Sequence, residues 1–447
     1  MIPGEFERRL GIDFFSTTSE GLGGGLRQVP EDFVVREILK DGAVADPERY
    51  DLTQPDKGGF LVCILEKRGQ DTLTAVRKLA GKMRIDENRI DFAGLKDAHA
   101  LTYQFVTVQR KRPSEIVGLQ VNGVRLFPLF RSNRPMRSEP LAGNEFEISL
   151  RGIQLSRGEA RRRAEAIRAE ILQMKGVANF FGYQRFGVLR PITHLIGRHL
   201  LEGDCRGAVM TYLTAPSMIE DSSLNEIRGK LFETMDFGKA LRTFPKRLEY
   251  ERILLSYLDG RPDDHIGAIR RLPLRLRRLF IHAYQAYLFN KILSERIRSR
   301  LSLVEAELGD RVCELSLLGN LEREPMQVDC RNLDNVNQKI RLGRTAIVLP
   351  IIGLDTSFSD GVQGQIERRI VEKEELDEKA YRMSVMPELK AYGGHRTAMM
   401  RVSMFARARI SEDLLNANMV TAKMRFSLPK GSYATILLRE FMKSENP

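Results

Sequence analysis

The stretch of residues 94–104, which begins as a short polar loop, carries the side chain best suited to chemistry in this chain. It places the carboxylate of Asp97 between two segments with the character of strands, 90–93 before it and 102–109 after it. An aspartate is ionised at neutral pH without special tuning, and the neighbouring Lys96 favours the charged form. Asp97 therefore suits a nucleophile or an electrostatic stabiliser better than a general acid. The structural alternative is an ordinary turn or cap residue.

The elements around this loop can be predicted from periodicity and capping. Residues 71–84 have helical apolar spacing with Asp71 or Thr72 as the cap, and this helix should pack on the sheet. Ser156 and Glu159 have the spacing of a capping box, which predicts a helix that stops at Gly176. Near the end of the sequence, a strand at 420–428 and a helix at 433–443 flank a turn at 429–432. Its free N–H groups could hold a phosphate, and Ser432 as a plain N-cap explains the turn equally well.

The middle of the chain, residues 188 to about 390, has a different character. It is richer in helical pattern, with helices expected at 248–259 and 278–298, and it contains a glycine-rich, acidic run at 353–378 that reads as a loop. His282 falls in an apolar helical stretch, so we expect a core histidine there.

Composition bounds the partner and the setting. The 447 residues include 42% hydrophobic residues and no apolar run of transmembrane length, which predicts a soluble protein of two or three domains without a membrane partner. The net charge of +12 favours a polyanionic partner such as RNA. The four cysteines are far apart and the six histidines lack metal spacing, so we expect no metal site, no disulfide framework and a reducing cytoplasm. No protein partner is implied.

The loop around Asp97 resembles a family signature. Its pattern Gly-x-Lys-Asp-x-x-Ala-x-Thr-x-Gln, from Gly94 to Gln104, is similar to that of the TruD family of tRNA pseudouridine synthases. Further segments resemble the same family in the same order along the chain, at residues 30–37, 143–146, 176–187, 282–290 and 428–435.

The resemblance implies isomerisation of uridine to pseudouridine in tRNA, at position 13 of the D arm, without a cofactor. Asp97 is the implied catalytic residue, and it would either attack C1′ to form a covalent intermediate or remove the C2′ proton to give a glycal. The target uridine would be flipped into the pocket. The implied substrate-binding residues are Asn144, Phe146, Arg27, Lys96 and Gln104. The candidates for RNA binding are Arg185, Lys430, Ser432 and His99.

Three of these residues have specific expected tasks. Phe146 would stack on the detached base, Asn144 would hydrogen-bond near Asp97 or the base, and Arg27 could pair with Asp97. Arg27 stands where the family often has lysine, and a guanidinium binds a carboxylate in a planar fork. Phe146 lacks the hydroxyl of the tyrosine found in other pseudouridine synthase families, so another group or water must take the C5 proton.

The resemblance also implies the architecture. We expect an α+β pseudouridine synthase fold with a mixed, mainly antiparallel sheet, interrupted by a second α+β domain specific to this family. The expected parts are 1–177 for the first part of the catalytic domain, 178–392 for the inserted domain and 393–447 for the second part of the catalytic domain, with a basic cleft between the lobes.

Two other function classes remain open at this stage. The first is a catalytically inactive tRNA-binding protein of the same fold. The second is a metal-dependent RNA hydrolase with Asp97 as a ligand, which would require further carboxylates beside it.

Overall fold

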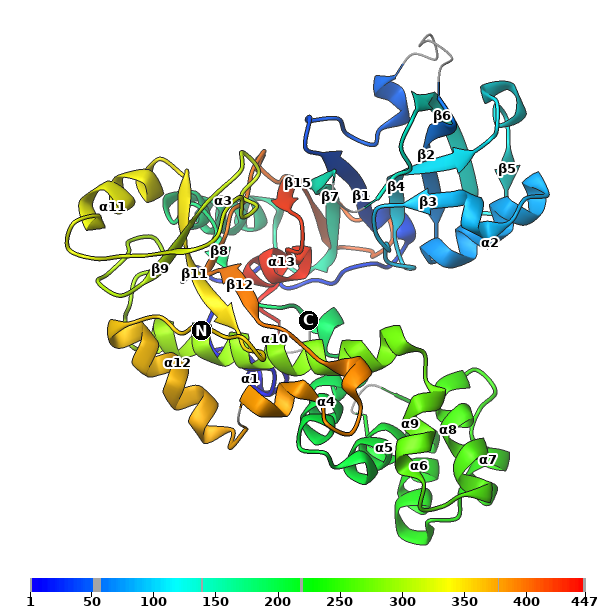
Figure 1. Ribbon diagram of the computed structural model, residues 1–447. Coiled ribbons are helices and arrows are strands. Elements are labelled where there is room, and N and C mark those ends of the chain that lie inside the picture. Colours follow the sequence, from blue (N-terminus) through cyan, green and yellow to red (C-terminus); the bar gives the residue numbers. More distant parts are fainter. Residues whose placement is uncertain (1, 51–57, 138–139, 218–219, 377, 445–447) are drawn as a thin grey trace.

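A mixed sheet dominates one side of the molecule (Figure 1). The computed structural model describes residues 2–50, 58–137, 140–217, 220–376 and 378–444. Within these ranges nine strands form the sheet in the order β14-β15-β7-β1-β4-β2-β6-β5, with β3 also paired to β4. Only β1 and β4 run parallel among these pairs. The bounds are β1 (Phe33–Leu39), β2 (Phe60–Arg68), β3 (Ile90–Phe92), β4 (Leu101–Gln109), β5 (Gln120–Val121), β6 (Val124–Ser132), β7 (Leu141–Ile153), β14 (Arg409–Glu412) and β15 (Val420–Pro429). The predicted α+β class with a mixed, mainly antiparallel sheet is confirmed.

Helices predicted from capping residues or from apolar spacing pack beside this sheet. They are α2 (Thr72–Met83), α3 (Arg157–Gln173) and α13 (Ala434–Met442). Ser432 is not the N-cap of α13, because the helix begins at Ala434, after Tyr433, and has no side-chain cap. The Asp71 side chain accepts a hydrogen bond from the Thr74 N–H at 3.0 Å, and Ser156 accepts one from the Glu159 N–H at 3.2 Å. These caps satisfy N–H groups that the first turn of a helix leaves unpaired. The apolar face of α2 is buried with one face of β2 and β4.

A second, smaller sheet and most of the helices form the other side. Its strands follow the order β10-β9-β11-β12, and the long helix α10 runs across the centre of the molecule in Figure 1. The remaining strands are β8 (Val177–Ala178), β9 (Arg311–Glu314), β10 (Met326–Gln327), β11 (Thr345–Ile351), β12 (Gly394–Thr397) and β13 (Met399–Met400). The remaining α-helices are α1 (Glu5–Arg8), α4 (Thr193–Leu201), α5 (Cys205–Thr214), α6 (Ser222–Thr234), α7 (Phe237–Thr243), α8 (Glu249–Gly260), α9 (His265–Arg271), α10 (Leu274–Arg298), α11 (Leu333–Arg341) and α12 (Gly361–Lys373). Short 3₁₀ turns are η1 (Pro30–Asp32), η2 (Pro47–Arg49), η3 (Glu87–Arg89), η4 (Pro113–Glu115), η5 (Tyr183–Arg185), η6 (Glu378–Arg382) and η7 (Pro387–Leu389).

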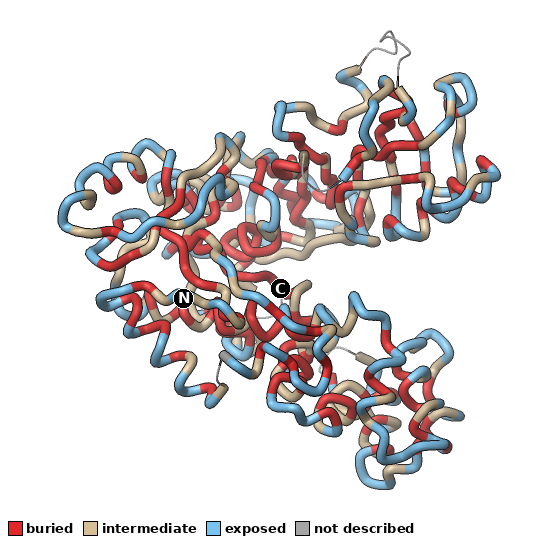
Figure 2. Tube along the Cα trace, in the orientation of Figure 1, coloured by how far each residue is buried: buried red, intermediate tan, exposed pale blue. Residues whose placement is uncertain are grey.

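One continuous core joins the two sides. Buried side chains of β1, β7, β15 and α13 share a hydrophobic cluster with those of α4, α5, α10 and β11, and burial follows α10 along much of its length (Figure 2). Gly197 lets α4 approach α10 closely, because a Cβ there would lie 2.1 Å from the Phe280 carbonyl oxygen. None of the described helices is both long enough and apolar enough to cross a membrane.

The first residues are tied to elements that come much later in the chain. The buried carboxylate of Glu7 accepts two hydrogen bonds of 2.7 Å from the guanidinium of Arg439 on α13. Glu440 accepts the backbone N–H groups of Ser16 and Thr17, each at 3.0 Å. On α10, the Asn290 amide donates to the Leu10 carbonyl at 3.0 Å. These hydrogen bonds therefore fix residues 7–17 against α10 and α13.

Two expectations about the middle of the chain were wrong. The run at 353–378 is not a loop throughout, because α12 occupies Gly361–Lys373 and buries Ile366 and Ile370. Two of the glycines that suggested a loop sit at the first turn of α12, where Gly361 has a φ of +58° and Gly364 packs against Ser359. His282 is not a core histidine, since it lies on the exposed side of α10.

The domain boundaries stay a prediction. Residue 178 lies in β8 and residue 393 directly precedes β12, which pairs with β11 of the smaller sheet, whereas β14 and β15 belong to the larger one. Sheet membership thus changes after β13, a few residues beyond the predicted boundary at 392/393.

Candidate active site

The loop that carries Asp97 connects β3 to β4, and two buried polar side chains, those of Thr72 and Gln104, hold it by hydrogen bonds. The Gln104 amide donates to the Gly94 carbonyl at 3.2 Å, and the Thr72 hydroxyl donates to the Gln104 Oε1 at 3.0 Å. The same hydroxyl oxygen accepts the Lys96 backbone N–H at 3.0 Å. Thr72 and Gln104 are both fully buried. Because a buried polar group must be hydrogen-bonded, these contacts fix the loop to β4 and α2.

Asp97 projects from this loop with its carboxylate accessible. Its side chain is 47% exposed, and Oδ2 accepts a hydrogen bond of 2.6 Å from Nη2 of Arg27. The Arg27 guanidinium lies 4.2 Å from the centre of the Phe33 ring, which holds it by a cation–π contact. The contact predicted between Arg27 and Asp97 is therefore present, while a role for Arg27 in substrate binding stays a prediction.

A buried lysine that sequence reasoning missed supports the backbone at Asp97. Nζ of Lys67, on β2, donates to the carbonyl oxygens of Asp97 at 2.6 Å and Gln70 at 2.8 Å. Burial lowers the pKa of Lys67 to about 8, although the negative charges of Asp97 and Asp71 oppose this shift. A lysine at the end of a strand gives no sequence signal of such a contact, since its partners lie in two different loops.

The sequence suggested that Lys96 supports the charge of its neighbour Asp97, but in the structure Lys96 pairs with other residues. Its Nζ lies 2.9 Å from Oε1 of Glu37 and 2.9 Å from Oδ1 of Asn144. Glu37 is fully buried on β1, and its Oε2 accepts the Phe105 N–H at 2.9 Å. A buried carboxylate attracts the nearest cation strongly, which explains why Lys96 turns away from the more exposed Asp97. With its oxygen occupied, Asn144 presents its NH₂ group as the available donor.

These residues surround a cavity of about 240 Å³, which we call the Asp97 cavity. Asn144 and Phe146 reach it from β7, where Phe146 pairs in register with Val35 on β1 and with Phe426 on β15. The close fit of β7 against β15 requires Gly143, since a Cβ there would lie 2.4 Å from the Leu428 carbonyl oxygen. The cavity is lined by Phe33, Val35, Leu95, Lys96, Asp97, Thr102, Asn144, Phe146, Gln184, Ser432, Tyr433, Ala434 and Thr435.

Phe146 is a rigid part of the cavity wall. Phe426 stacks on it with ring centres 5.4 Å apart and an interplanar angle of 25°, and Phe33 packs edge-on at 6.2 Å. Only 6% of the residue is exposed. A flat ligand would therefore meet a fixed apolar surface, consistent with the predicted stacking role, which stays a prediction.

The structure thus gathers some of the sequence-predicted residues and separates others. Asp97, Lys96, Asn144, Phe146 and Ser432 line the Asp97 cavity, and Arg27 contacts it through Asp97. Gln104 lies beneath the loop as a positioning residue. Arg185 and Lys430 line an adjoining cavity, and His99 is exposed on the loop and lines neither. Gln184, Tyr433 and Thr435 lie in the family-like segments 176–187 and 428–435 without an expected role, and all three line the Asp97 cavity.

A family model described as tRNA pseudouridine synthase D (TruD) matches residues 9–441. The chain belongs to this family. Membership makes it a pseudouridine synthase, an enzyme of the isomerase class. The TruD resemblance predicted from the motifs is confirmed.

Individual TruD relatives are similar over nearly their full length. A "Probable tRNA pseudouridine synthase D" of Methanosarcina acetivorans is 38% identical over 442 residues, which cover 98% of this chain and 97% of the relative. A protein of the same description from Methanococcoides burtonii is 36% identical over 440 residues, with the same coverage of both chains. The crystal structure of a TruD protein from Methanosarcina mazei matches with a TM-score of 0.83 at 35% identity, covering 100% of this chain and 99% of that one.

The hydrolase alternative lacks the ligand cluster that it requires within the described ranges. No group of three or more His, Cys, Asp or Glu side chains there is arranged to hold a metal ion. The cations that contact Asp97 are instead Arg27, at its carboxylate, and Lys67, at its backbone carbonyl.

Proposed function

We propose that the chain converts a uridine of tRNA to pseudouridine with Asp97 as the nucleophile. The observation that carries this proposal is the accessible Asp97 carboxylate at a cavity whose wall holds a rigid phenyl ring and an oriented amide. Uridine isomerisation needs a carboxylate near the sugar, a flat apolar surface for the base and a donor for a uracil oxygen. Asp97, Phe146 and Asn144 supply these three features.

The reaction breaks one bond to C1′ and makes another to the same carbon. In the covalent route an Asp97 oxygen bonds to C1′ while the N1–C1′ bond breaks and its electron pair leaves on the uracil. The uracil anion then turns in the cavity, C5 attacks C1′ as the carboxylate departs, C5 gives its proton to water or a nearby base, and N1 takes up a proton. In the glycal route Asp97 removes the C2′ proton, a C1′–C2′ double bond forms and the N1–C1′ electron pair leaves with the uracil. Asp97 returns the proton to C2′ as C5 bonds to C1′, and the C5 proton is again exchanged for one on N1. Both routes need Asp97 ionised at the start.

Arg27 and Asn144 have complementary tasks in this scheme. The ion pair with Arg27 holds the carboxylate in place before substrate enters, and a guanidinium does not take up the C5 proton. The Asn144 NH₂ group would donate to a uracil oxygen, where negative charge develops as the glycosidic bond breaks.

The target uridine must leave its stack to reach the cavity, at a cost of about a few kcal/mol. Contacts between cationic side chains and RNA phosphates would offset this cost. On the family resemblance we propose position 13 of the D arm as the target, and on the cysteine pattern a cytoplasmic location.

The test is tritium release from tRNA transcripts labelled at uridine C5, with the parent protein and Asp97→Asn measured side by side and the modified position mapped. The parent should release tritium, and Asp97→Asn should bind tRNA equally well with activity lower by at least about a thousandfold.

Each alternative gives a different result. Silence from both proteins with tRNA binding retained would favour an inactive tRNA-binding protein. Loss of activity on adding a chelator, with cleaved RNA as the product, would favour the hydrolase.

A further inference from the structure

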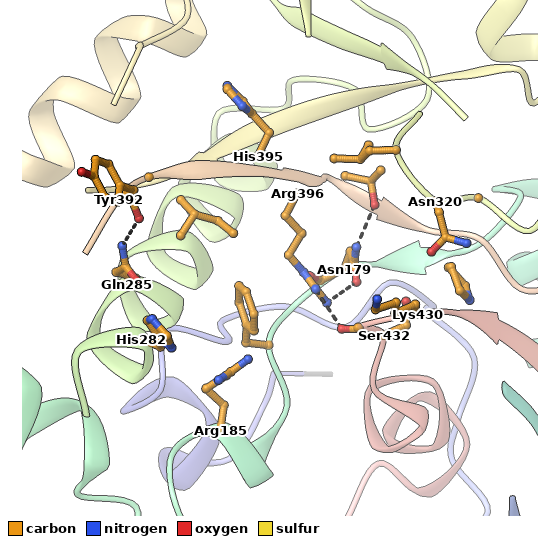
Figure 3. Close-up of a pocket in the computed structure, with 18 residues that line it drawn as sticks. Asn179, Arg185, His282, Gln285, Asn320, Tyr392, His395, Arg396, Lys430 and Ser432 are labelled. Atoms are coloured by element: carbon orange, nitrogen blue, oxygen red, sulfur yellow. Dashed lines mark hydrogen bonds between the residues drawn. The ribbon is translucent and has the colours of Figure 1, made fainter. Parts of the chain in front are cut away.

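A second cavity of about 390 Å³ adjoins the Asp97 cavity, and we call it the flanking cavity. The two share Ser432, in the turn between β15 and α13. Its other walls come from the segment after β8, from η5, from α10 and from β12 (Figure 3). It therefore lies where the larger sheet meets the smaller one.

The flanking cavity has basic side chains and no acidic ones in its lining. Arg185, Arg396 and Lys430 line it together with His282 and His395, and none of its 18 lining residues is an aspartate or glutamate. Partial desolvation at the cavity wall lowers the pKa of His282, although the residue is exposed at the surface of α10, and the charges of Arg185 and Arg278 lower it further. Desolvation and the charge of Arg311 also lower the pKa of His395. The permanent positive charge of the cavity is that of the two arginines and the lysine.

Arg396 holds the walls together. Its guanidinium donates to the Asn179 carbonyl at 2.9 Å, to Oδ1 of Asn179 at 2.6 Å and to the Gly431 carbonyl at 2.9 Å. These acceptors are neutral, so they position the guanidinium without cancelling its charge. Burial lowers the pKa of Arg396 to about 10, which leaves it charged at neutral pH.

Arg185 is the side chain best placed to bind a ligand. Its guanidinium lies 5.5 Å from the centre of the Phe181 ring, and within the described ranges no carboxylate comes within salt-bridge distance of it. Its Nε is buried without a hydrogen-bond partner. In Figure 3 it lies below Arg396 and near His282 on one side of the cavity. An arginine held by an aromatic ring and lacking an acidic partner suits a phosphate.

The rim offers a surface for a base. Tyr392 is 57% exposed, and its backbone carbonyl is fixed by a 2.9 Å hydrogen bond from the Gln285 amide (Figure 3). Exposed aromatic rings beside a cationic groove are typical stacking platforms for single-stranded RNA.

We propose that the flanking cavity binds the nucleotide next to the target uridine, with its phosphate on Arg185 and its base against Tyr392. This inference rests on the proposed function, because a uridine in the Asp97 cavity brings its neighbour in the strand to the far side of Ser432. Arg185 and Tyr392 would then fix the strand while the target base is detached.

The first experiment measures tRNA affinity as a function of salt for the parent, Arg185→Gln, Arg185→Lys and Arg331→Gln. Arg331 lines neither cavity and its side chain is 87% exposed, so it controls for the loss of one charge. Arg185→Gln should bind about tenfold more weakly, with the slope of log affinity against log salt reduced by about one. Arg185→Lys should keep the parental slope. Equal affinity and slope for Arg185→Gln and Arg331→Gln would overturn the proposal.

The second experiment uses tRNA transcripts with an abasic residue on either side of the target uridine, scored by affinity and by tritium release. The parent should bind the transcript with the lesion on one side several-fold more weakly than the intact transcript, whereas Tyr392→Ala should bind these two transcripts equally well. The proposal would be overturned if, at both positions, the loss from the lesion and the loss from Tyr392→Ala multiplied as independent effects. A parent that binds tRNA but releases no tritium would instead contradict the proposed function, and the affinities would still decide on the flanking cavity.

Discussion

The Asp97 cavity and the flanking cavity share Ser432 but differ in how their cations are held. At the Asp97 cavity, Arg27 is paired with the Asp97 carboxylate and Lys96 with the buried Glu37. In the flanking cavity, Arg396 contacts only neutral acceptors through its hydrogen bonds, and Arg185 has the face of Phe181. The first arrangement suits chemistry on an uncharged base with a preset carboxylate. In the second arrangement the arginines contact neutral groups, so their positive charge can attract an anion.

The largest expected effect tests the pairing of Lys96. Lys96→Met would leave the fully buried Glu37 carboxylate without its cation, and we expect the free energy of unfolding to fall by about 3–5 kcal/mol. The matched change Arg185→Met strands no carboxylate and should cost less than about 1 kcal/mol. Urea denaturation of both variants measures the difference. The double variant Lys96→Met with Glu37→Gln should recover most of the loss, and equal costs for the two single variants would break the comparison.

The next effect concerns the amide at Asn144. Asn144→Asp keeps an oxygen for Lys96 but removes the NH₂ donor proposed for a uracil oxygen. We expect the single-turnover rate of tritium release to fall about a hundredfold, or about 2.7 kcal/mol, with tRNA affinity retained. A variant with the parental rate would exclude Asn144 as the donor. A rate loss explained wholly by weaker binding would place its role in affinity.

A pH experiment sharpens the role of buried charge at Lys67. With a pKa of about 8 when folded and about 10.4 when unfolded, Lys67 is charged in both states below pH 8, and the full burial cost applies. Between these values only the unfolded state keeps the proton, so this group makes the free energy of unfolding rise with pH. Relative to Lys67→Met, the parent should gain about 2 kcal/mol between pH 7 and pH 10. Parallel curves for the two proteins would contradict the lowered pKa.

The smallest effect separates the two arginines by their kinetics. Arg27→Gln should reduce the single-turnover rate about tenfold, because Asp97 loses the partner that orients it, and tRNA affinity should change little. Arg185→Gln should instead weaken tRNA binding about tenfold and change the single-turnover rate little. Arg27→Lys should restore most of the rate, since Arg27 contacts the Asp97 carboxylate through a single nitrogen, Nη2, and a lysine can make one such contact. A shared pattern for Arg27→Gln and Arg185→Gln would show that the cavities do not divide positioning from binding.

Local signals predicted the elements that present Asp97, because alternation and capping act within a few residues. The strand at 102–109, the helix after Asp71 and the helix after Ser156 follow from such patterns. Asn144 and Phe146 came from the family resemblance, and periodicity alone would only have placed them on a strand.

Contacts between distant segments could not be predicted in this way. Lys96 faces Glu37 because that carboxylate is buried on another strand, and burial is a property of the folded molecule. Lys67 meets the Asp97 carbonyl although the two residues are 30 positions apart in the sequence. The flanking cavity draws its residues from segments between 179 and 432, so no single motif describes it.

The ties between the first residues and α13 have a consequence for synthesis on the ribosome. Glu7 is translated 432 residues before its buried partner Arg439. Until α13 has left the exit tunnel, the Glu7 carboxylate lacks that cation and Ser16 and Thr17 lack the Glu440 acceptor. The nascent chain therefore cannot complete its native core before α13 emerges, and the amino-terminal segment lacks these partners while the sequence between them is synthesised.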